Sequence, residues 1–255
     1  MKVVVAVKQT PSPDSVLTPD ESAKWVQEEN LSFEMNEPDA YALEAALQLR
    51  EKQGGEVIAI TLGPERAEKV LREALAKGAD RAIHAVCPSL DVLDPLQTAQ
   101  ALAEVVRPEA PHLVLTGLQS GDLGFAQTGV ILAELLSLPH ATIIVGVEPA
   151  PGGVRAKREL EGGWYQFLEL PLPAVLTVQS GISRLRYATL MGIKKARTKE
   201  IRRVHVATPP PTGGPAALVR LYPPDRSTHT QFLEGDPREV AASLVERLRF
   251  EARVL

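Results

Sequence analysis

Val3-Val4-Val5-Ala6-Val7 begins the chain as a short apolar run rich in β-branched residues, and runs of similar character recur along the first 150 residues. The later runs are residues 57–62, 82–86, 113–116 and 142–147. Segments with helical periodicity separate them. Strands that are apolar at every position are buried on both faces. The alternation therefore predicts an α/β fold of Rossmann-like type, with a mostly parallel twisted sheet and helices on both faces.

Capping residues mark several predicted helix ends. Asp94-Pro95 precedes a helix over residues 96–106 as an N-cap followed by proline, and Gly78 ends a helix over residues 66–77. Asn36-Glu37-Pro38-Asp39 likewise precedes a helix over residues 40–50 and places a cap and carboxylates at its start.

The second half of the chain has a different pattern. Residues 154–160 and 164–170 flank Glu161-Gly162-Gly163 and predict a β-hairpin, and residues 174–178 predict a further buried strand. A proline- and glycine-rich connector follows at 209–215, and Asp236-Pro237 starts a helix. We expect a nucleotide-binding domain over 1–204 and an extended C-terminal arm over 205–255. The arm helix carries an apolar stripe made of Ala241, Leu244, Val245 and Leu248.

Composition excludes several classes of protein. The chain has 255 residues, 44% of them hydrophobic, and a net charge of −4, so a folded core is expected and binding to nucleic acid is not. One cysteine, Cys87, cannot form an internal disulfide or a cysteine metal cluster, and we expect it to be buried. No stretch approaches the roughly 18 to 20 apolar residues that span a bilayer. We expect a cytoplasmic protein with no metal and no membrane insertion.

No catalytic constellation is visible. The sequence lacks a phosphate-binding loop with its lysine, a G-x-G-x-x-G turn and a G-x-S-x-G elbow. The five histidines are scattered without ligand spacing. We therefore expect no catalytic residues in this chain.

The loop at residues 117–129 is the strongest candidate for binding a ligand. It runs from the strand at 113–116 into the next helix, and its glycines would let backbone amides approach a phosphate at the positive helix end. The carboxyl end of a strand is where doubly wound sheets bind nucleotides. The simpler alternative is a polar loop in which Thr128 caps the helix.

Several motifs occur in the order found in a known family. They are Val5-Ala6-Val7-Lys8-Gln9, Met35-Asn36-Glu37-Pro38-Asp39-Ala40, the loop from Gly117 to Gly129, Arg158-Glu159-Leu160-Glu161-Gly162-Gly163, and Arg186-Tyr187-Ala188-Thr189-Leu190. With these motifs, residues 1–204 resemble electron transfer flavoprotein β subunits. The resemblance implies a heterodimer with an α subunit that holds most of the FAD. The chain would then carry electrons from flavin dehydrogenases, such as acyl-CoA dehydrogenases, to a quinone oxidoreductase of the respiratory chain.

The resemblance also implies a structural AMP in this subunit. Its contact positions would be Ala6, Asn36, Glu37, Pro38, Asp39, Leu62, Gly117, Gln119, Ser120, Gly121, Asp122, Phe125, Ala126, Gln127 and Thr128. Many family members have several acids and an asparagine in this loop, whereas this chain has only Asp122 and places Ala126 before Gln127. Backbone contacts are therefore expected to matter more than side-chain contacts.

Residues 184–203 match the family's recognition loop for dehydrogenases. The stretch holds eight basic residues against one acid, Glu200, and surrounds apolar Leu190 and Met191. An apolar anchor within a ring of cations resembles an interface hot spot. The alternatives are a solvated basic face, or a Leu190 that belongs to the core. The expected partner-recognition residues are Arg186, Tyr187, Leu190, Met191, Lys194 and Lys195, together with Arg158 and Glu159, which match a segment near the mobile flavin domain.

Three other interpretations stay open at this point. Some relatives bind a second FAD in place of AMP and bifurcate electrons, and their loop also contains glycine and aspartate. A stand-alone nucleotide-binding module of the universal-stress type would share the sheet but lack the hairpin and the arm. An α/β enzyme that hydrolyses nucleotides would require a phosphate-loop lysine or a carboxylate cluster.

Overall fold

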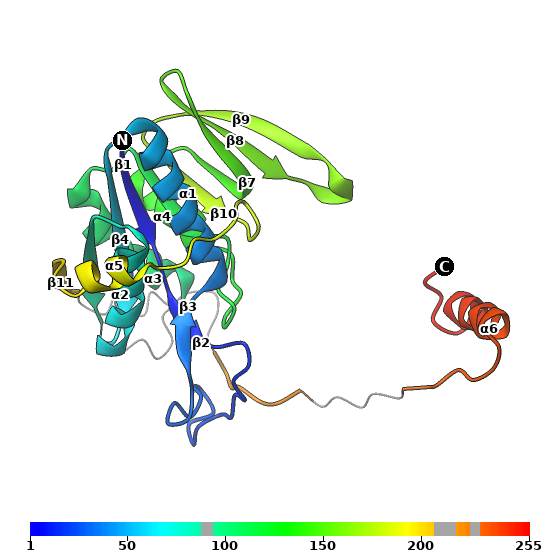
Figure 1. Cartoon of the computed structure of the whole chain (residues 1–255). Coiled ribbons are helices and arrows are strands. Elements are labelled where there is room, and N and C mark those ends of the chain that lie inside the picture. Colours follow the sequence, from blue (N-terminus) through cyan, green and yellow to red (C-terminus); the bar gives the residue numbers. More distant parts are fainter. Residues whose placement is uncertain (88–93, 207–217, 225–229) are drawn as a thin grey trace. The chain divides into compact units, whose positions relative to one another are not determined.

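A nine-stranded sheet forms the centre of the computed structural model, which describes residues 1–87, 94–206, 218–224 and 230–255 (Figure 1). The strands from β11 to β7 in this order are parallel, and β8 and β9 are antiparallel. This confirms the Rossmann-like α/β prediction. The order is β11 (Ile201–His205), β5 (Arg81–Val86), β4 (Glu56–Gly63), β1 (Lys2–Ala6), β6 (Leu113–Gly117), β10 (Ala174–Val178), β7 (His140–Ala150), β8 (Gly153–Glu159) and β9 (Tyr165–Pro171).

The valines of β1 lie at the middle of the sheet. Val5 pairs with Ala59 on β4 and with Leu115 on β6, and Val3, Val4 and Val5 are fully buried. Successive side chains of a strand point to opposite faces. Val3 and Val5 accordingly belong to one hydrophobic core and Val4 to the other.

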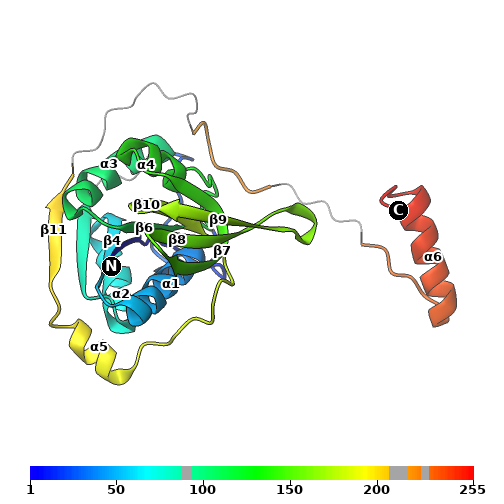
Figure 2. The same ribbon diagram turned by 90° about the horizontal axis from the view of Figure 1, so that it is seen from above.

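Helices cover both faces of the sheet (Figure 2). The helices on one side are α1 (Glu37–Gln53), α2 (Glu68–Lys77) and α5 (Leu190–Ala196), and those on the other are α3 (Pro95–Val106) and α4 (Thr128–Leu136). Short 3-10 turns occupy Glu65–Ala67, Arg107–Glu109 and Glu161–Gly163. The predicted stripe of α2, which contains Val70, Leu71, Ala74 and Leu75, is buried in the first core, and Cys87 is buried in the second.

The predicted helix ends are confirmed at three places and corrected at one. Asp94 forms a capping box with Gln97, Gly78 is the C-cap of α2, and Asn36 is the N-cap of α1. The alternative interpretation of Thr128 as a cap is wrong, because α4 begins at Thr128 and Gln127 is its N-cap.

The hairpin of β8 and β9 is confirmed, and it extends the sheet beyond the helices (Figure 1). Gly162 and Gly163 form its turn with positive φ angles of 69° and 78°, which glycine adopts without strain. Two features were not predicted. A small antiparallel sheet pairs β2 (Gln9–Pro11) with β3 (Phe33–Met35), and β11 adds an edge strand from within the basic stretch.

The contacts divide the chain into two units, Met1–Leu221 and Tyr222–Leu255. The second unit contains the predicted C-terminal helix, α6 (Pro237–Phe250), which Asp236 caps. No residue of α6 is buried, and Ala241, Leu244 and Val245 of its apolar stripe are exposed. The proline-rich connector at 209–215 lies outside the described residues. In the part of the chain that the structure describes, no helix is both long and apolar enough to cross a membrane.

Candidate nucleotide site at the carboxyl edge of the sheet

Asp39 joins the ends of two adjacent parallel strands. Its Oδ2 accepts a hydrogen bond from the Lys8 amide just after β1, and its Oδ1 accepts one from the Gly117 amide at the end of β6, both at 2.8 Å. A Cβ atom at position 117 would lie only 2.3 Å from Asp39 Oδ1, so the close approach requires glycine. Asp39 thereby brings the first turn of α1 against both strand ends.

Asn36 fixes the loop that follows β6. Its amide nitrogen donates to the Gln119 carbonyl and its Oδ1 accepts from the Gly121 amide, both at 3.0 Å. The Asn36 backbone amide also donates to the Lys8 carbonyl at 2.9 Å. The side chain makes no capping bond to its own helix, although it stands at the N-cap position. Asn36 is therefore a cap by position and a loop anchor by its contacts.

The carboxyl group of Asp39 is unusual because it is buried. Burial raises its pKa to about 6, although the hydrogen bonds from Lys8, Asn36 and Gly117 favour the charged form. Asp39 is thus a buried carboxyl group, with a pKa of about 6, at the point where the ends of β1 and β6 meet the start of α1.

Lys8 is a polar residue at this edge that was not predicted to belong to the site. Its ammonium group contacts both Asp122 oxygens, at 2.6 Å and 2.7 Å, and lies 3.4 Å from Ser120 Oγ. Burial alone would raise the pKa of Asp122, but the Lys8 charge and hydrogen bond hold it below its usual range. A signal was available, because Lys8 directly follows a buried strand beside the loop after β6.

The amino end of α4 lies next to this loop. A Cβ atom on Gly129 would come within 2.5 Å of Thr177 Cγ2 and 2.6 Å of Thr116 Oγ1, so glycine lets the first turn of α4 pack directly on β6 and β10. Gln127, the N-cap, forms no side-chain capping bond, which leaves the first amides of α4 without that acceptor. Uncapped amides at the positive end of a helix can bind an anion.

The structure links several of the predicted nucleotide-site residues and leaves others in different surroundings. Hydrogen bonds or ion pairs connect one group, which consists of Asn36, Asp39, Gly117, Gln119, Ser120, Gly121 and Asp122. The amides of Gly117 and Gly121 are already bound to the side chains of Asp39 in α1 and of Asn36 at its N-cap. The positions outside these bonds are Ala6 at the end of β1, Leu62 near the end of β4, Glu37 and Pro38 in the first turn of α1, and Phe125, Ala126, Gln127 and Thr128 leading into α4.

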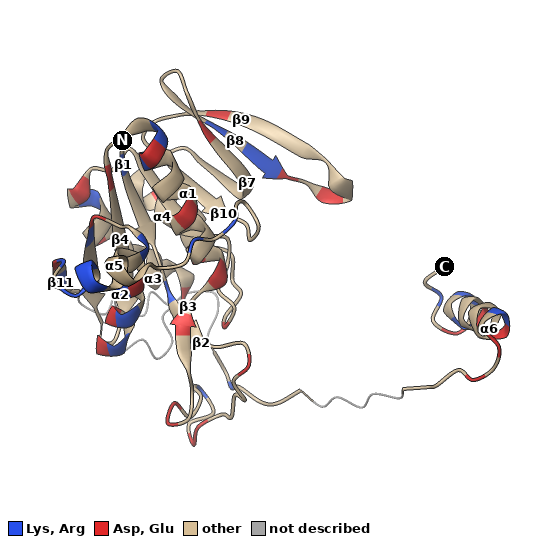
Figure 3. Ribbon diagram, viewed as in Figure 1, with Lys and Arg blue, Asp and Glu red and all other residues tan. Residues whose placement is uncertain are grey.

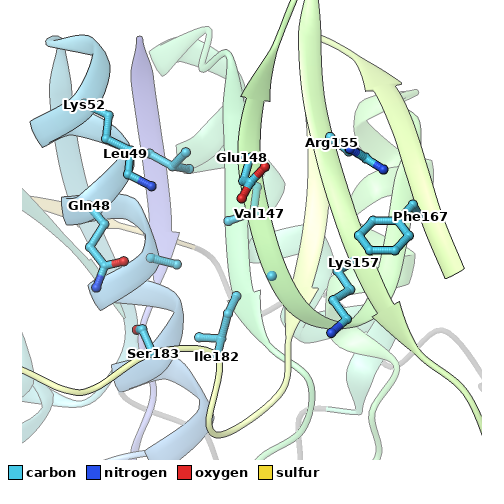
Figure 4. A pocket seen from close by; sticks show the side chains of 12 residues that line it. Gln48, Leu49, Lys52, Val147, Glu148, Arg155, Lys157, Phe167, Ile182 and Ser183 are labelled. Atoms are coloured by element: carbon cyan, nitrogen blue, oxygen red, sulfur yellow. The ribbon is translucent and has the colours of Figure 1, made fainter. Parts of the chain in front are cut away.

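A cavity of about 240 Å³ lies elsewhere, between α1 and the strands β7 to β9 (Figure 4). Gln48, Leu49 and Lys52 line it from α1, and Glu148, Arg155, Lys157 and Phe167 line it from the strands. None of the predicted nucleotide contacts is among its lining residues. We assign the candidate nucleotide site from the bonded loops and not from this cavity, because the loops converge at strand ends and present amides.

The basic stretch at 184–203 is not a single loop. It crosses α1, forms α5 and ends in β11, and Figure 3 shows Lys and Arg gathered on α5 and β11. The cations of β11 are paired within the chain, since Arg202 contacts Glu109 and Arg203 contacts Glu68. Basic residues on an edge strand can pair with acids of their own domain, which a charge count does not reveal.

The other predicted recognition residues differ in their surroundings. Tyr187, Leu190 and Met191 are exposed, with 87% of the Leu190 surface accessible, so the interpretation of Leu190 as core is wrong. Lys194 and Lys195 are exposed on α5. Arg186 is instead bound to Glu44 and Glu51 of α1.

Arg158 and Glu159 lie at the end of β8. The Arg158 guanidinium donates to Thr142 Oγ1 on β7 at 2.7 Å, and Arg158 Nε is buried. Arg158 is therefore held against the sheet and is not a freely exposed hairpin charge.

Comparisons with known proteins identify the family. The electron transfer flavoprotein domain matches residues 24–209. The chain is 37% identical to the electron transfer flavoprotein subunit beta of Methylophilus methylotrophus, with 96% of this chain and 97% of that protein covered. It is 34% identical to the same subunit of Bacillus subtilis, with coverage of 92% and 90%, and 39% identical to that of Sus scrofa, with coverage of 68% and 69%. The chain therefore belongs to the family of electron transfer flavoprotein β subunits.

Proposed function

We propose that this chain pairs with an FAD-carrying α subunit and forms a soluble carrier of electrons. The carrier would accept electrons from flavin dehydrogenases, such as acyl-CoA dehydrogenases, and deliver them to a quinone oxidoreductase. The FAD would supply the redox chemistry. This chain would bind AMP as a structural group, dock the dehydrogenase and contribute no catalytic residue.

The observation that supports AMP binding most strongly is the bonding of α1 to the loop after β6. Asn36 and Asp39 hold the strand ends of β1 and β6 and the loop backbone in one arrangement. A preorganised loop loses less entropy when it binds a ligand. The bonded edge is thus suited to hold a nucleotide permanently.

The phosphate donors would be the first amides of α4. Gly117 and Gly121 use their amides within the chain, whereas the α4 amides lack a side-chain cap. Lys8 would add a positive charge next to Ser120, with Asp122 keeping its ammonium group in place. Ala6 and Leu62 would border the nucleotide at the neighbouring strand ends.

The proposed α-subunit partner fits the apolar groups that the chain displays. The hairpin exposes Trp164, Tyr165 and Phe167, and the arm helix exposes Leu244 and Val245. Aromatic residues are enriched in the buried centres of protein interfaces. Both segments are therefore candidates for subunit contact.

Cofactor analysis of the heterodimer tests the proposal. After coexpression with the α subunit, acid extraction and chromatography should release one FAD and one AMP per complex. Two FAD and no AMP would overturn the AMP assignment and place the chain among the bifurcating relatives. A monomeric chain that binds neither α subunit nor flavin would overturn the carrier function and favour a stand-alone nucleotide-binding module.

A further inference from the structure

The segment that leads from β10 to α5 carries exposed apolar side chains but has no regular structure of its own. Residues 182–189 form neither helix nor strand, and Tyr187 is 91% exposed. Leu190 and Met191 follow at the start of α5 and are also exposed. We call residues 182–191 the docking segment. A surface of this kind can bind a partner firmly only if its backbone is held in one place.

Arg186 provides the most extensive polar attachment that the structure shows for the docking segment. Its Nε and Nη2 donate to the two carboxylate oxygens of Glu44, at 2.8 Å and 2.9 Å. Its Nη1 and Nη2 donate to Glu51, at 2.6 Å and 3.2 Å, and its backbone amide lies 3.3 Å from Glu44 Oε2. One guanidinium therefore binds two carboxylates on the same face of α1.

The burial of Glu44 makes the loss of this ion pair energetically unfavourable. Only 4% of Glu44 is exposed, and its second neighbour is Gln48, which donates to Oε1 at 2.9 Å. A buried carboxylate without its cation is strongly unfavourable. The planar fork of arginine donates through separate nitrogens to both Glu44 oxygens and to Glu51, a geometry that the single nitrogen of a lysine does not reproduce.

The other end of the docking segment is fixed by α5. Thr189 Oγ1 accepts a hydrogen bond from the Gly192 amide at 3.0 Å and caps the helix. Gly192 lies against the carbonyl of Ala76 at the end of α2, where a Cβ atom would clash with it. The exposed Tyr187 and Leu190 thus lie between an ion-pair clamp on α1 and a packed contact on α2.

We propose that Arg186 is a positioning residue that clamps the docking segment to α1 and sets the orientation in which Tyr187, Leu190 and Met191 meet a partner protein. The clamp itself depends only on this chain. The identity of the partner as a flavin dehydrogenase rests on the proposed function.

Hydrogen exchange of the docking-segment amides tests the clamp directly. In Arg186→Gln, the amide of residue 186, which donates to Glu44 in the wild type, should exchange at least about tenfold faster, whereas Arg186→Lys should fall between Gln and wild type. Arg184→Gln is the matched control, because Arg184 is an exposed cation two residues away for which the described residues show no hydrogen bond or ion pair. Unchanged exchange in Arg186→Gln would overturn the clamp.

A double variant tests the clamp even if Arg186→Gln alone fails to fold. Arg186→Gln with Glu44→Gln removes both charges, so no buried carboxylate is left unpaired. It should fold and still show fast exchange in the docking segment. If it folds and exchanges at the wild-type rate, the clamp is overturned.

Docking is measured with the αβ complex and a flavin dehydrogenase that reduces the wild-type complex. Arg186→Gln should raise the KM for the complex at least about fivefold, with little change in kcat and in nucleotide content. Leu190→Ala should raise the KM without faster exchange. A raised KM in Leu190→Ala alone would overturn the positioning role. An unchanged KM in both variants would overturn the docking function, and the positioning role with it.

Discussion

Asp39 combines burial, charge and bonds to segments that are distant in sequence. Its carboxylate lies 31 residues from Lys8 and 78 residues from Gly117, yet it accepts a hydrogen bond from each amide. Backbone amides that are buried need such acceptors. The bonds hold the carboxylate in place even though burial raises its pKa to about 6.

The titration of Asp39 predicts a pH effect with a defined sign. Its folded pKa of about 6 exceeds the ordinary value of 3.8, so the folded protein binds more protons than the unfolded chain between these values. Relative to Asp39→Asn, which does not titrate, the wild type should gain stability as the pH falls from 7 to 5. Over this pH range the gain should be about 1.3 kcal/mol. Urea unfolding of both proteins at each pH measures it, and a constant difference between them would contradict the prediction.

The close packing around Gly129 predicts that a larger residue at this position destabilises the fold. In Gly129→Ala the new methyl group would meet Thr177 and Thr116 at contacts far below van der Waals distance. Overpacking should destabilise the fold by about 1–3 kcal/mol, which exceeds the gain of up to about 1 kcal/mol from the higher helix propensity of alanine. Gly121→Ala is the matched control, because the nearest atom to its Cβ is 3.9 Å away. In chemical denaturation, the midpoint of Gly129→Ala should be lower than that of the wild type, and the midpoint of Gly121→Ala should not. Equal midpoints for the two variants would refute the packing argument.

The short helix α5 presents an apolar side chain outside the core. Because Leu190 is 87% exposed, Leu190→Ala should leave the melting temperature unchanged. An anchor that fills a partner's pocket contributes about 2 kcal/mol or more, so docking should weaken by about 30-fold at any salt concentration. Lys194→Ala, in the same helix, should instead alter mainly the association rate and its salt dependence. Reduction kinetics at low and high salt compare the two, and wild-type kinetics in Leu190→Ala would exclude an anchoring role.

The C-terminal unit contains the helix α6. We propose that this arm docks on the α subunit, because Leu244 and Val245 are exposed and no residue of α6 is buried. Deletion of residues 216–255 should raise the dissociation constant of the heterodimer at least about tenfold, which corresponds to about 1.4 kcal/mol. Sedimentation or calorimetry would measure this dissociation constant.

Surface substitutions in the arm distinguish the contribution of its apolar face to heterodimer affinity from the contribution of its charges. Leu244→Asp with Val245→Asp should weaken the heterodimer as the deletion does. Glu246→Ala with Arg249→Ala, on the same helix, should change the dissociation constant by less than about threefold. An unchanged constant after deletion would mean that the arm does not contribute to subunit binding.

Much of the fold followed from local patterns. The apolar runs predicted β1, β4, β5 and β6, because strands that are buried on both faces must be apolar throughout. They also predicted β7, although only Ala141 and Ile144 of that strand are buried. Asp94, Gly78 and Asp236 predicted helix ends, because each supplies a local hydrogen bond or a backbone conformation. The edge strand β11 escaped prediction, because Arg202 and Arg203 made it resemble a solvated basic face.

The sequence by itself determined the central strands of the sheet, the hairpin and the loop at 117–129, because periodicity and turn residues act over a few positions. The tertiary structure decided how distant side chains are used. Asn36 lies 83 residues from Gln119, Lys8 lies 114 residues from Asp122, and Arg186 lies 142 residues from Glu44. Each of these polar side chains could equally have faced water, and only the packing of α1 on the parallel strands β1, β6 and β10 brings their partners within hydrogen-bonding distance.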